Sequence, residues 1–153
     1  WKDIRYPIGY IHEDEFVIHR LLKKANKIKT IKEKLYFYRQ NLGSIMNSGF
    51  TINRLDRYSA YSDRIIFLRR EISKDRIEIL LRIFIRNYFN DFYKFWNPDK
   101  IDLHLIRMKY AFARIFSIFI RFHFFNIKEI ISFLLFFISP KFYYHRFYKK
   151  NNI

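Results

Sequence analysis

The sequence has 153 residues and contains no cysteine, only three glycines and only three prolines. The absence of cysteine excludes a disulfide framework and any thiolate metal site or nucleophile, and it fits a reducing compartment. So few chain-breaking residues favour helices over a β fold with many turns. Three glycines in all also leave no Gly-rich loop of the kind that holds a phosphate group.

Long apolar runs and metal-binding motifs are missing as well. The longest apolar run without a charge covers residues 130–139, whereas a helix needs about 20 apolar residues to cross a bilayer. We therefore predict no transmembrane helix. The stretch HEDEF is not an H-E-x-x-H zinc motif, because Phe16 stands in place of the second histidine. His12 and His19 have no third ligand at a suitable spacing, so we expect both to be exposed and no metal site in this chain.

The sequence is rich in apolar, aromatic and basic residues. Apolar residues make up 50% of the chain and aromatic ones 22%, and the formal net charge is +16. This composition supports a sizeable core and predicts an anionic partner. Residues 103–153 combine nine Lys or Arg residues with a single acid, Glu129. Basic residues among bulky apolar ones, such as Arg114 and Arg121, are typical of a helix lying at the headgroups of an anionic membrane. The alternative is that these apolar faces pack against one another and on further chain.

No nucleic-acid recognition module is visible, so we predict no nucleic-acid partner. Apolar periodicity instead predicts helices over most of the chain. Val17, Leu21 and Ala25 recur at helical spacing and predict a helix over residues 13–25. Alternation in KLYFYRQ predicts a short β-hairpin with strands near 28–31 and 34–39. The remainder is predicted to be helical, with helices over 51–70, 73–96, 102–124 and 127–139 and a short last helix opened by Pro140.

Three carboxylates, Glu13, Asp14 and Glu15, stand side by side at the start of the first predicted helix. One interpretation is electrostatic, since acids at a helix N-terminus complement its free N–H groups and its dipole. The other is functional, because a carboxylate held rigidly at a loop-to-helix junction can accept a proton from a substrate hydroxyl. Pro7 and Gly9 predict a tight turn just before the acids, which would present them at such a junction.

A second stretch, LYFYRQNLGSIM, places Arg39 and Gln40 at the end of the second predicted strand. The arginine side chain is suited to bidentate contact with a phosphate or carboxylate group. The alternative is an ion pair between Arg39 and an acid of this chain, for example one of the triplet.

Together, IRYPIGYIHEDEF and ANKIKTIKEKLYFYRQNLGSIM resemble the C-terminal half of the catalytic domain of bacterial glycosyltransferase family 2. The shared pattern is an aromatic-Pro-x-Gly turn, a Glu-Asp pair that opens a helix, and a hairpin ending in Tyr-x-Tyr-Arg with a following Ser-Ile. The matching residues are Tyr6, Pro7, Gly9, Glu13, Asp14, Tyr36, Tyr38, Arg39, Ser44 and Ile45. The resemblance therefore covers about residues 1–46.

This resemblance implies an inverting transfer of a sugar from a nucleotide-sugar donor to an acceptor hydroxyl, in bacterial cell-surface glycan synthesis. By similarity, Asp14 would be the general base and Glu13 would orient the acceptor, while Arg39, Gln40 and His12 would contact substrate. Such enzymes usually need Mg²⁺ or Mn²⁺, held by an Asp-x-Asp motif that this sequence does not contain.

The implied fold is an α/β parent, GT-A and Rossmann-like, of which this chain would be a C-terminal fragment, mostly α with a short β-hairpin. Residues 1–48 would complete the catalytic domain and residues 49–153 would form a basic helical extension. We expect the nucleotide-binding half to precede Trp1, and residues 1–153 alone to be inactive.

The implied acceptor is a glycan or a lipid-linked glycan, met at the inner, cytoplasmic face of the cytoplasmic membrane, where the basic extension would hold the enzyme. The alternative is a non-catalytic, basic membrane-peripheral or interaction module.

Overall fold

The computed structural model describes residues 3–37, 51–97, 99–100, 102–122 and 124–148. Within them the chain is helical, as the low glycine and proline content predicted. The elements in chain order are α1 (Glu13–Lys24), the 3₁₀ helix η1 (Ile52–Asp56), α2 (Arg57–Leu68), α3 (Lys74–Phe95), α4 (Leu103–Phe122), α5 (Ile127–Ile138), α6 (Pro140–Tyr143) and the π-helical turn η2 (Tyr144–Tyr148). The predicted helix over 51–70 therefore starts with a 3₁₀ segment, and the other predicted bounds lie within a few residues of those observed.

The predicted β-hairpin is wrong for every part of it that the structure describes. Residues 28–37 contain no strand, and residues 38–48 lie outside the described residues. The apolar side chains of this stretch, among them Ile28, Ile31 and Leu35, are exposed. An isolated two-stranded hairpin is stable only when its apolar face packs on another element. Among the described residues, no element covers the side chains of Ile28, Ile31 and Leu35. The mostly helical fold is confirmed, and no Rossmann-like unit occurs in the described part.

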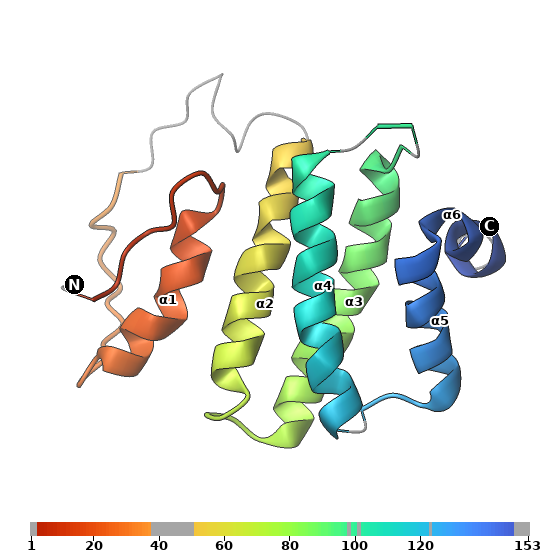
Figure 1. The fold of residues 1–153 in the computed structure, drawn as a ribbon. Helices are drawn as coiled ribbons and strands as arrows, with labels where there is room; N and C mark the ends of the chain where they lie inside the picture. Colours follow the sequence, from red (N-terminus) through yellow and green to blue (C-terminus); the bar gives the residue numbers. More distant parts are fainter. Residues whose placement is uncertain (1–2, 38–50, 98, 101, 123, 149–153) are drawn as a thin grey trace.

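The helices stand side by side, with α2, α3 and α4 in the middle, α1 at one end and α5 with α6 at the other (Figure 1). α2 and α4 pack together and run in the same direction. The core is unusually aromatic, and its fully buried rings are those of Tyr58, Tyr88, Phe92, Phe112 and Phe136. The rings of Tyr88 and Phe112, for example, lie 4.6 Å apart between centroids. Edge-to-face and offset ring contacts of this kind stabilise beyond the area they bury.

The segment YAFARIFSIFIRFHFF, residues 110–125, is the part of the basic C-terminal third that contains Arg114 and Arg121, and its buried residues belong to this core. Phe112, Ile115 and Phe116 of α4 are buried. The ring of Phe112 contacts Phe89 of α3, and the rings of Phe112 and Phe116 both contact Phe133 of α5. The second interpretation of this segment, in which its apolar faces pack on one another, therefore applies to α4. None of the helices in the described residues is long and apolar enough to cross a membrane.

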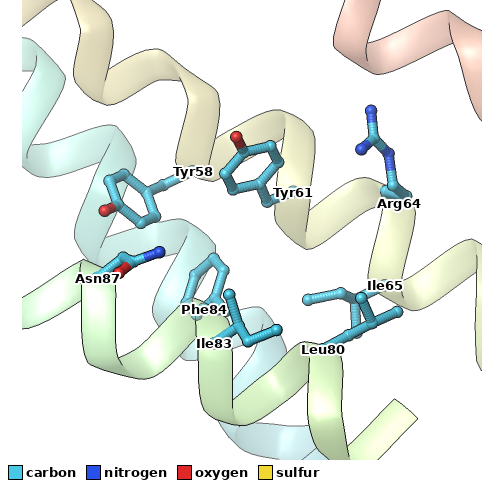
Figure 2. Close-up of a pocket in the computed structure, with 8 residues that line it drawn as sticks. All are labelled: Tyr58, Tyr61, Arg64, Ile65, Leu80, Ile83, Phe84 and Asn87. Atoms are coloured by element: carbon cyan, nitrogen blue, oxygen red, sulfur yellow. The ribbon is translucent and has the colours of Figure 1, made fainter. Parts of the chain in front are cut away.

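A hollow of about 230 Å³ lies between α2 and α3 (Figure 2). Its walls are the rings of Tyr58, Tyr61 and Phe84 with the aliphatic side chains of Ile65, Leu80 and Ile83, and Arg64 and Asn87 lie at its rim. The hollow is therefore apolar, with one cation beside it.

Candidate functional site

The acidic triplet follows a turn whose backbone takes up unusual angles. Gly9 has φ of 77° and His12 has φ of 64°, so both are left-handed. That region is open to glycine and uncommon for any other residue. His12 is the N-cap of α1, its carbonyl accepts from the Glu15 N–H at 3.1 Å, and its side chain makes no capping bond. The prediction that the three acids occupy the first turn of a helix is confirmed.

A buried carboxylate, that of Asp56, holds this turn in place. Asp56 ends η1 and is 1% exposed. Its Oδ2 accepts from the backbone N–H of Ile11 at 3.2 Å, and its Oδ1 lies 2.9 Å from His104 Nδ1. Arg107 Nη1 lies 3.4 Å from both carboxylate oxygens. A buried charge is costly unless it is paired and hydrogen-bonded, and these partners meet that need.

Arg107 of α4 also contacts the turn directly. Its Nη1 donates to the carbonyl of Gly9 at 2.9 Å, and its guanidinium lies 4.2 Å from the centroid of the Tyr10 ring. Ile11 and its partner Asp56 are 45 residues apart in the sequence, and Gly9 and its partner Arg107 are 98 residues apart. The position of the turn is thus set by η1 and α4, across the predicted domain boundary at residue 48.

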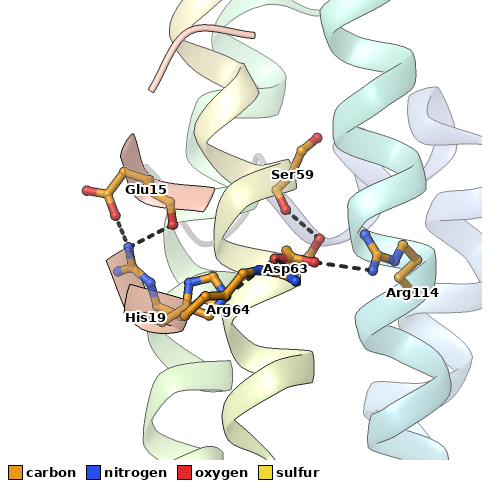
Figure 3. Close-up of polar contacts among 8 residues, drawn as sticks. Glu15, His19, Ser59, Asp63, Arg64 and Arg114 are labelled. Atoms are coloured by element: carbon orange, nitrogen blue, oxygen red, sulfur yellow. Dashed lines mark hydrogen bonds and ion pairs between the residues drawn. The ribbon is translucent and has the colours of Figure 1, made fainter. Parts of the chain in front are cut away.

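A polar seam fixes α1 against α2 below the turn (Figure 3). Arg64 pairs with the Glu15 carboxylate and donates to the Glu15 carbonyl at 3.2 Å. Asp63 pairs with Arg20, and its carboxylate lies 3.4 Å from His19 Nε2 and 3.9 Å from Arg114 Nη2. Glu15 is therefore used in packing helix on helix.

The expectation that His19 is exposed is wrong, because its side chain is buried in this seam. Burial lowers the pKa of His19 below its ordinary value, and the opposing charge of Asp63 does not reverse this. The side chain points toward α2 since α1 turns its polar face to that helix. Val17 of the predicted apolar stripe is buried, whereas Ile18 and Leu22, the next residues along from Val17 and Leu21, remain exposed.

Glu13 and Asp14 differ from these acids. Both are exposed, and neither carboxylate makes an ion pair or hydrogen bond with any residue that the structure describes. Asp14 borders a shallow hollow that it shares with Tyr6, Val17 and Leu21. Their neighbour Glu15, and the seam acid Asp63, both have partners. Glu33, Asp75 and Asp99 likewise have no side-chain partner among the described residues, so what distinguishes Glu13 and Asp14 is that they stand next to each other on a helix end whose preceding turn is anchored.

The remaining predicted site residues are His12, which the structure describes, and Arg39 and Gln40, which it does not. His12 is half-buried next to the two acids, and its Nε2 is buried without a hydrogen-bond partner in the described part of the chain. Arg39 and Gln40 lie outside the described residues. The structure thus brings His12, Glu13 and Asp14 together at one helix end.

Sequence reasoning missed Asp56, His104 and Arg107, although one signal for them exists. Asp56 and Asp63 are seven residues apart, and so are Arg107 and Arg114. Residues seven apart lie on the same face of a helix. An acid pair and an arginine pair with this same spacing therefore indicate that the two faces can pair with each other, acid to arginine. In the structure each acid of this pair does lie beside the corresponding arginine.

No group of three His, Asp or Glu side chains suited to a metal ion occurs among the residues that the structure describes. Mg²⁺ and Mn²⁺ need several oxygen ligands at one point. The family resemblance places the metal on an Asp-x-Asp motif that this sequence does not contain, so no chemical step is assigned to a metal here.

No protein-family model, curated protein or solved structure matches this chain. The resemblance to glycosyltransferase family 2 therefore stays a prediction.

Proposed function

We propose that this chain forms the acceptor side of an inverting glycosyltransferase, with Asp14 as the general base. The observation that carries the proposal is the contrast within the triplet. Glu15 pairs with Arg64, whereas Glu13 and Asp14 are exposed and have no ion pair or hydrogen bond within the described part of the chain, on a helix end that a buried carboxylate anchors. An unpaired carboxylate held in a fixed position is what a general base requires.

In the proposed reaction, the Asp14 carboxylate takes the proton of an acceptor hydroxyl as that oxygen attacks the anomeric carbon of the donor sugar. The bond from the anomeric carbon to the diphosphate oxygen breaks on the opposite face, and the nucleoside diphosphate leaves with that electron pair. The configuration at the anomeric carbon is thereby inverted. Glu13 would accept a hydrogen bond from a second acceptor hydroxyl and so orient the acceptor.

The proposed donor is a nucleotide-sugar, and the proposed acceptor is a glycan or lipid-linked glycan of the bacterial surface, met at the cytoplasmic face of the membrane. The nucleotide would bind to a preceding β-α-β half with the Asp-x-Asp motif. Such a half would also cover the apolar side chains of Ile18, Leu22 and Ile28, which are exposed around α1. Exposed apolar residues gathered on one side of a domain are typical of a surface that another domain covers.

The test compares Asp14→Asn with Glu15→Gln in the full protein encoded by the gene. We expect Asp14→Asn to lower turnover at least about 10²-fold, because it removes the base. Thermal unfolding should change little, because the Asp14 carboxylate has no ion-pair partner in the described fold and contributes only about 0.3–1 kcal/mol through the helix dipole. Glu15→Gln should change turnover little and cost at most about 1 kcal/mol of stability, since its pair with Arg64 is partly exposed.

Equal losses of turnover in the two variants would mean that the triplet has only an electrostatic role at the helix end.

The DNA sequence upstream of Trp1 gives a cheaper test. An open frame upstream of Trp1 that encodes alternating strands and helices with an Asp-x-Asp motif supports the transferase. A stop codon close upstream supports the non-catalytic membrane-peripheral module, which the exposed apolar and basic residues of the C-terminal third favour.

A further inference from the structure

Helix α5 is apolar on both of its faces. Phe133 and Phe136 point inward and are buried in the aromatic core. The opposite face carries an aliphatic stripe whose members are Ile127, Ile131, Leu134 and Ile138, exposed by 75%, 51%, 45% and 80%. Spacings of four, three and four residues align these side chains along one side of the helix. A helix that is apolar all round is normally covered all round, but the outer face of α5 has no cover in the described fold.

The position of α5 leaves this stripe accessible. α5 and α6 form one end of the row of helices, at the far side from α1 (Figure 1). Just beyond the stripe, Phe142 of α6 is half exposed as well. The stripe is therefore on the outside of the molecule.

The charges around the stripe are basic. Lys128 lies in its first turn, Lys141 follows its last residue, and Arg146 is exposed in η2. No acid among the described residues pairs with these three cations. Glu129, the single acid of residues 103–153, is used in the capping box with Asn126 and lies 3.9 Å from Arg82. The stripe thus lies among cations that have no acidic partner within the described ranges.

We propose that the outer face of α5 docks on an anionic lipid bilayer, with the aliphatic stripe among the acyl chains and the flanking cations at the phosphates. α5 has 12 residues and a length of about 18 Å, so it would lie in the plane of the interface rather than cross it. Lysine and arginine near an anionic leaflet are attracted to it. A second copy of the chain is disfavoured as the occupant, since each copy carries a net charge of +16.

This inference rests on the membrane partner of the proposed function and is independent of sugar transfer. It also moves the contact from residues 110–125, whose apolar side chains are mostly buried in α4, to α5. Deleting residues 103–153 would not test it, because that deletion also removes His104 and Arg107, which hold the acidic turn. Point variants on α5 avoid this problem.

The chain offers a matched control on α3. Ile79 and Ile83 are exposed by 58% and 45%, against 51% and 45% for Ile131 and Leu134. The α5 double variant combines Ile131→Asn and Leu134→Asn. Its control, the α3 double variant, combines Ile79→Asn and Ile83→Asn. The assay is flotation at low salt with vesicles of equal parts phosphatidylglycerol and phosphatidylcholine, and with vesicles of phosphatidylcholine alone.

The unchanged protein should float with the anionic vesicles and much less with the neutral ones. The α5 double variant should lose affinity for the anionic vesicles at least about tenfold, because two aliphatic side chains no longer insert. The α3 double variant should bind as the unchanged protein does. Equal binding by the two double variants, or no flotation of the unchanged protein, would overturn the proposal.

Two further measurements separate the alternatives. If sedimentation shows a dimer that the α5 double variant converts to a monomer, a second copy covers the stripe and the proposal is overturned. If the α5 double variant unfolds, a double variant that combines Lys128→Gln and Lys141→Gln replaces it. If this lysine variant binds anionic vesicles as the unchanged protein does, the proposal is overturned. Flotation of the Asp14→Asn variant should be normal, so loss of sugar transfer and loss of docking are distinguished.

Discussion

Replacing Asp56 by asparagine should destabilise the whole protein and release the acidic turn. The substitution keeps the shape of the side chain and one oxygen for the Ile11 N–H, but it removes the negative charge. His104 and Arg107 then face a neutral amide at a site where the original side chain is 1% exposed.

The magnitude follows from the bonds that are weakened. Hydrogen bonds to a charged group contribute about 1.5–3 kcal/mol each, and breaking a fully buried ion pair costs about 3–5 kcal/mol. The side chains of His104 and Arg107 are 22% and 23% exposed, so water replaces part of the loss. We therefore expect a loss of about 2–3 kcal/mol in the free energy of unfolding. For a chain of this length each kcal/mol shifts Tm by about 2–4 °C, which gives a fall of about 4–12 °C.

Thermal and urea unfolding, followed by circular dichroism, would measure this loss. Asp99→Asn is the control, since Asp99 is an exposed aspartate outside the helices. Hydrogen exchange at the Ile11 amide adds a local readout, because that N–H is bonded to Asp56. If Asp56→Asn and Asp99→Asn melt together, the buried carboxylate does not anchor the turn and the reasoning is wrong.

Two other predictions concern stability. Tyr58→Phe should cost about 1–2 kcal/mol in urea unfolding, because the Tyr58 hydroxyl donates to Asp91 at 2.5 Å in a buried setting; a cost no larger than that of Tyr61→Phe would contradict it. Burial lowers the pKa of His19, so the unfolded chain binds a proton there at higher pH than the folded one, and stability falls as pH drops below about 6.5. The urea midpoint of the unchanged protein should therefore fall more than that of His19→Gln when the pH is lowered from above to below that value, and identical pH profiles would refute the assignment.

The helices could be predicted from the sequence because their signals are local. Apolar periodicity, the NPD break at 97–99 and the start at Pro140 need no knowledge of distant residues. The strand alternation at 34–39 is equally local, but a strand forms only where another element accepts its apolar face. The apolar side chains of residues 35–37 are exposed, and residues 34–37 form no strand.

The site could be predicted in part for the same reason. The turn, the helix start and the exposed Asp14 follow from neighbouring residues. The anchoring contacts of Asp56 do not, because they join residues 45 to 51 positions apart. The burial of His19 was missed because α1 turns a polar face to α2, whereas periodicity assumes that the apolar stripe is the buried one.

The contact between Arg107 and Gly9 has a consequence for the nascent chain. The ribosome makes Gly9 98 residues before Arg107, and the tunnel delays the exposure of α4 further. Until then the loop before α1 has neither its guanidinium nor the imidazole of His104. Contacts between distant residues form late because the intervening chain must first be closed into a loop. The acids of the triplet are therefore translated before the residues that fix their position, so that a product released prematurely before α4 carries the triplet without its fixed geometry.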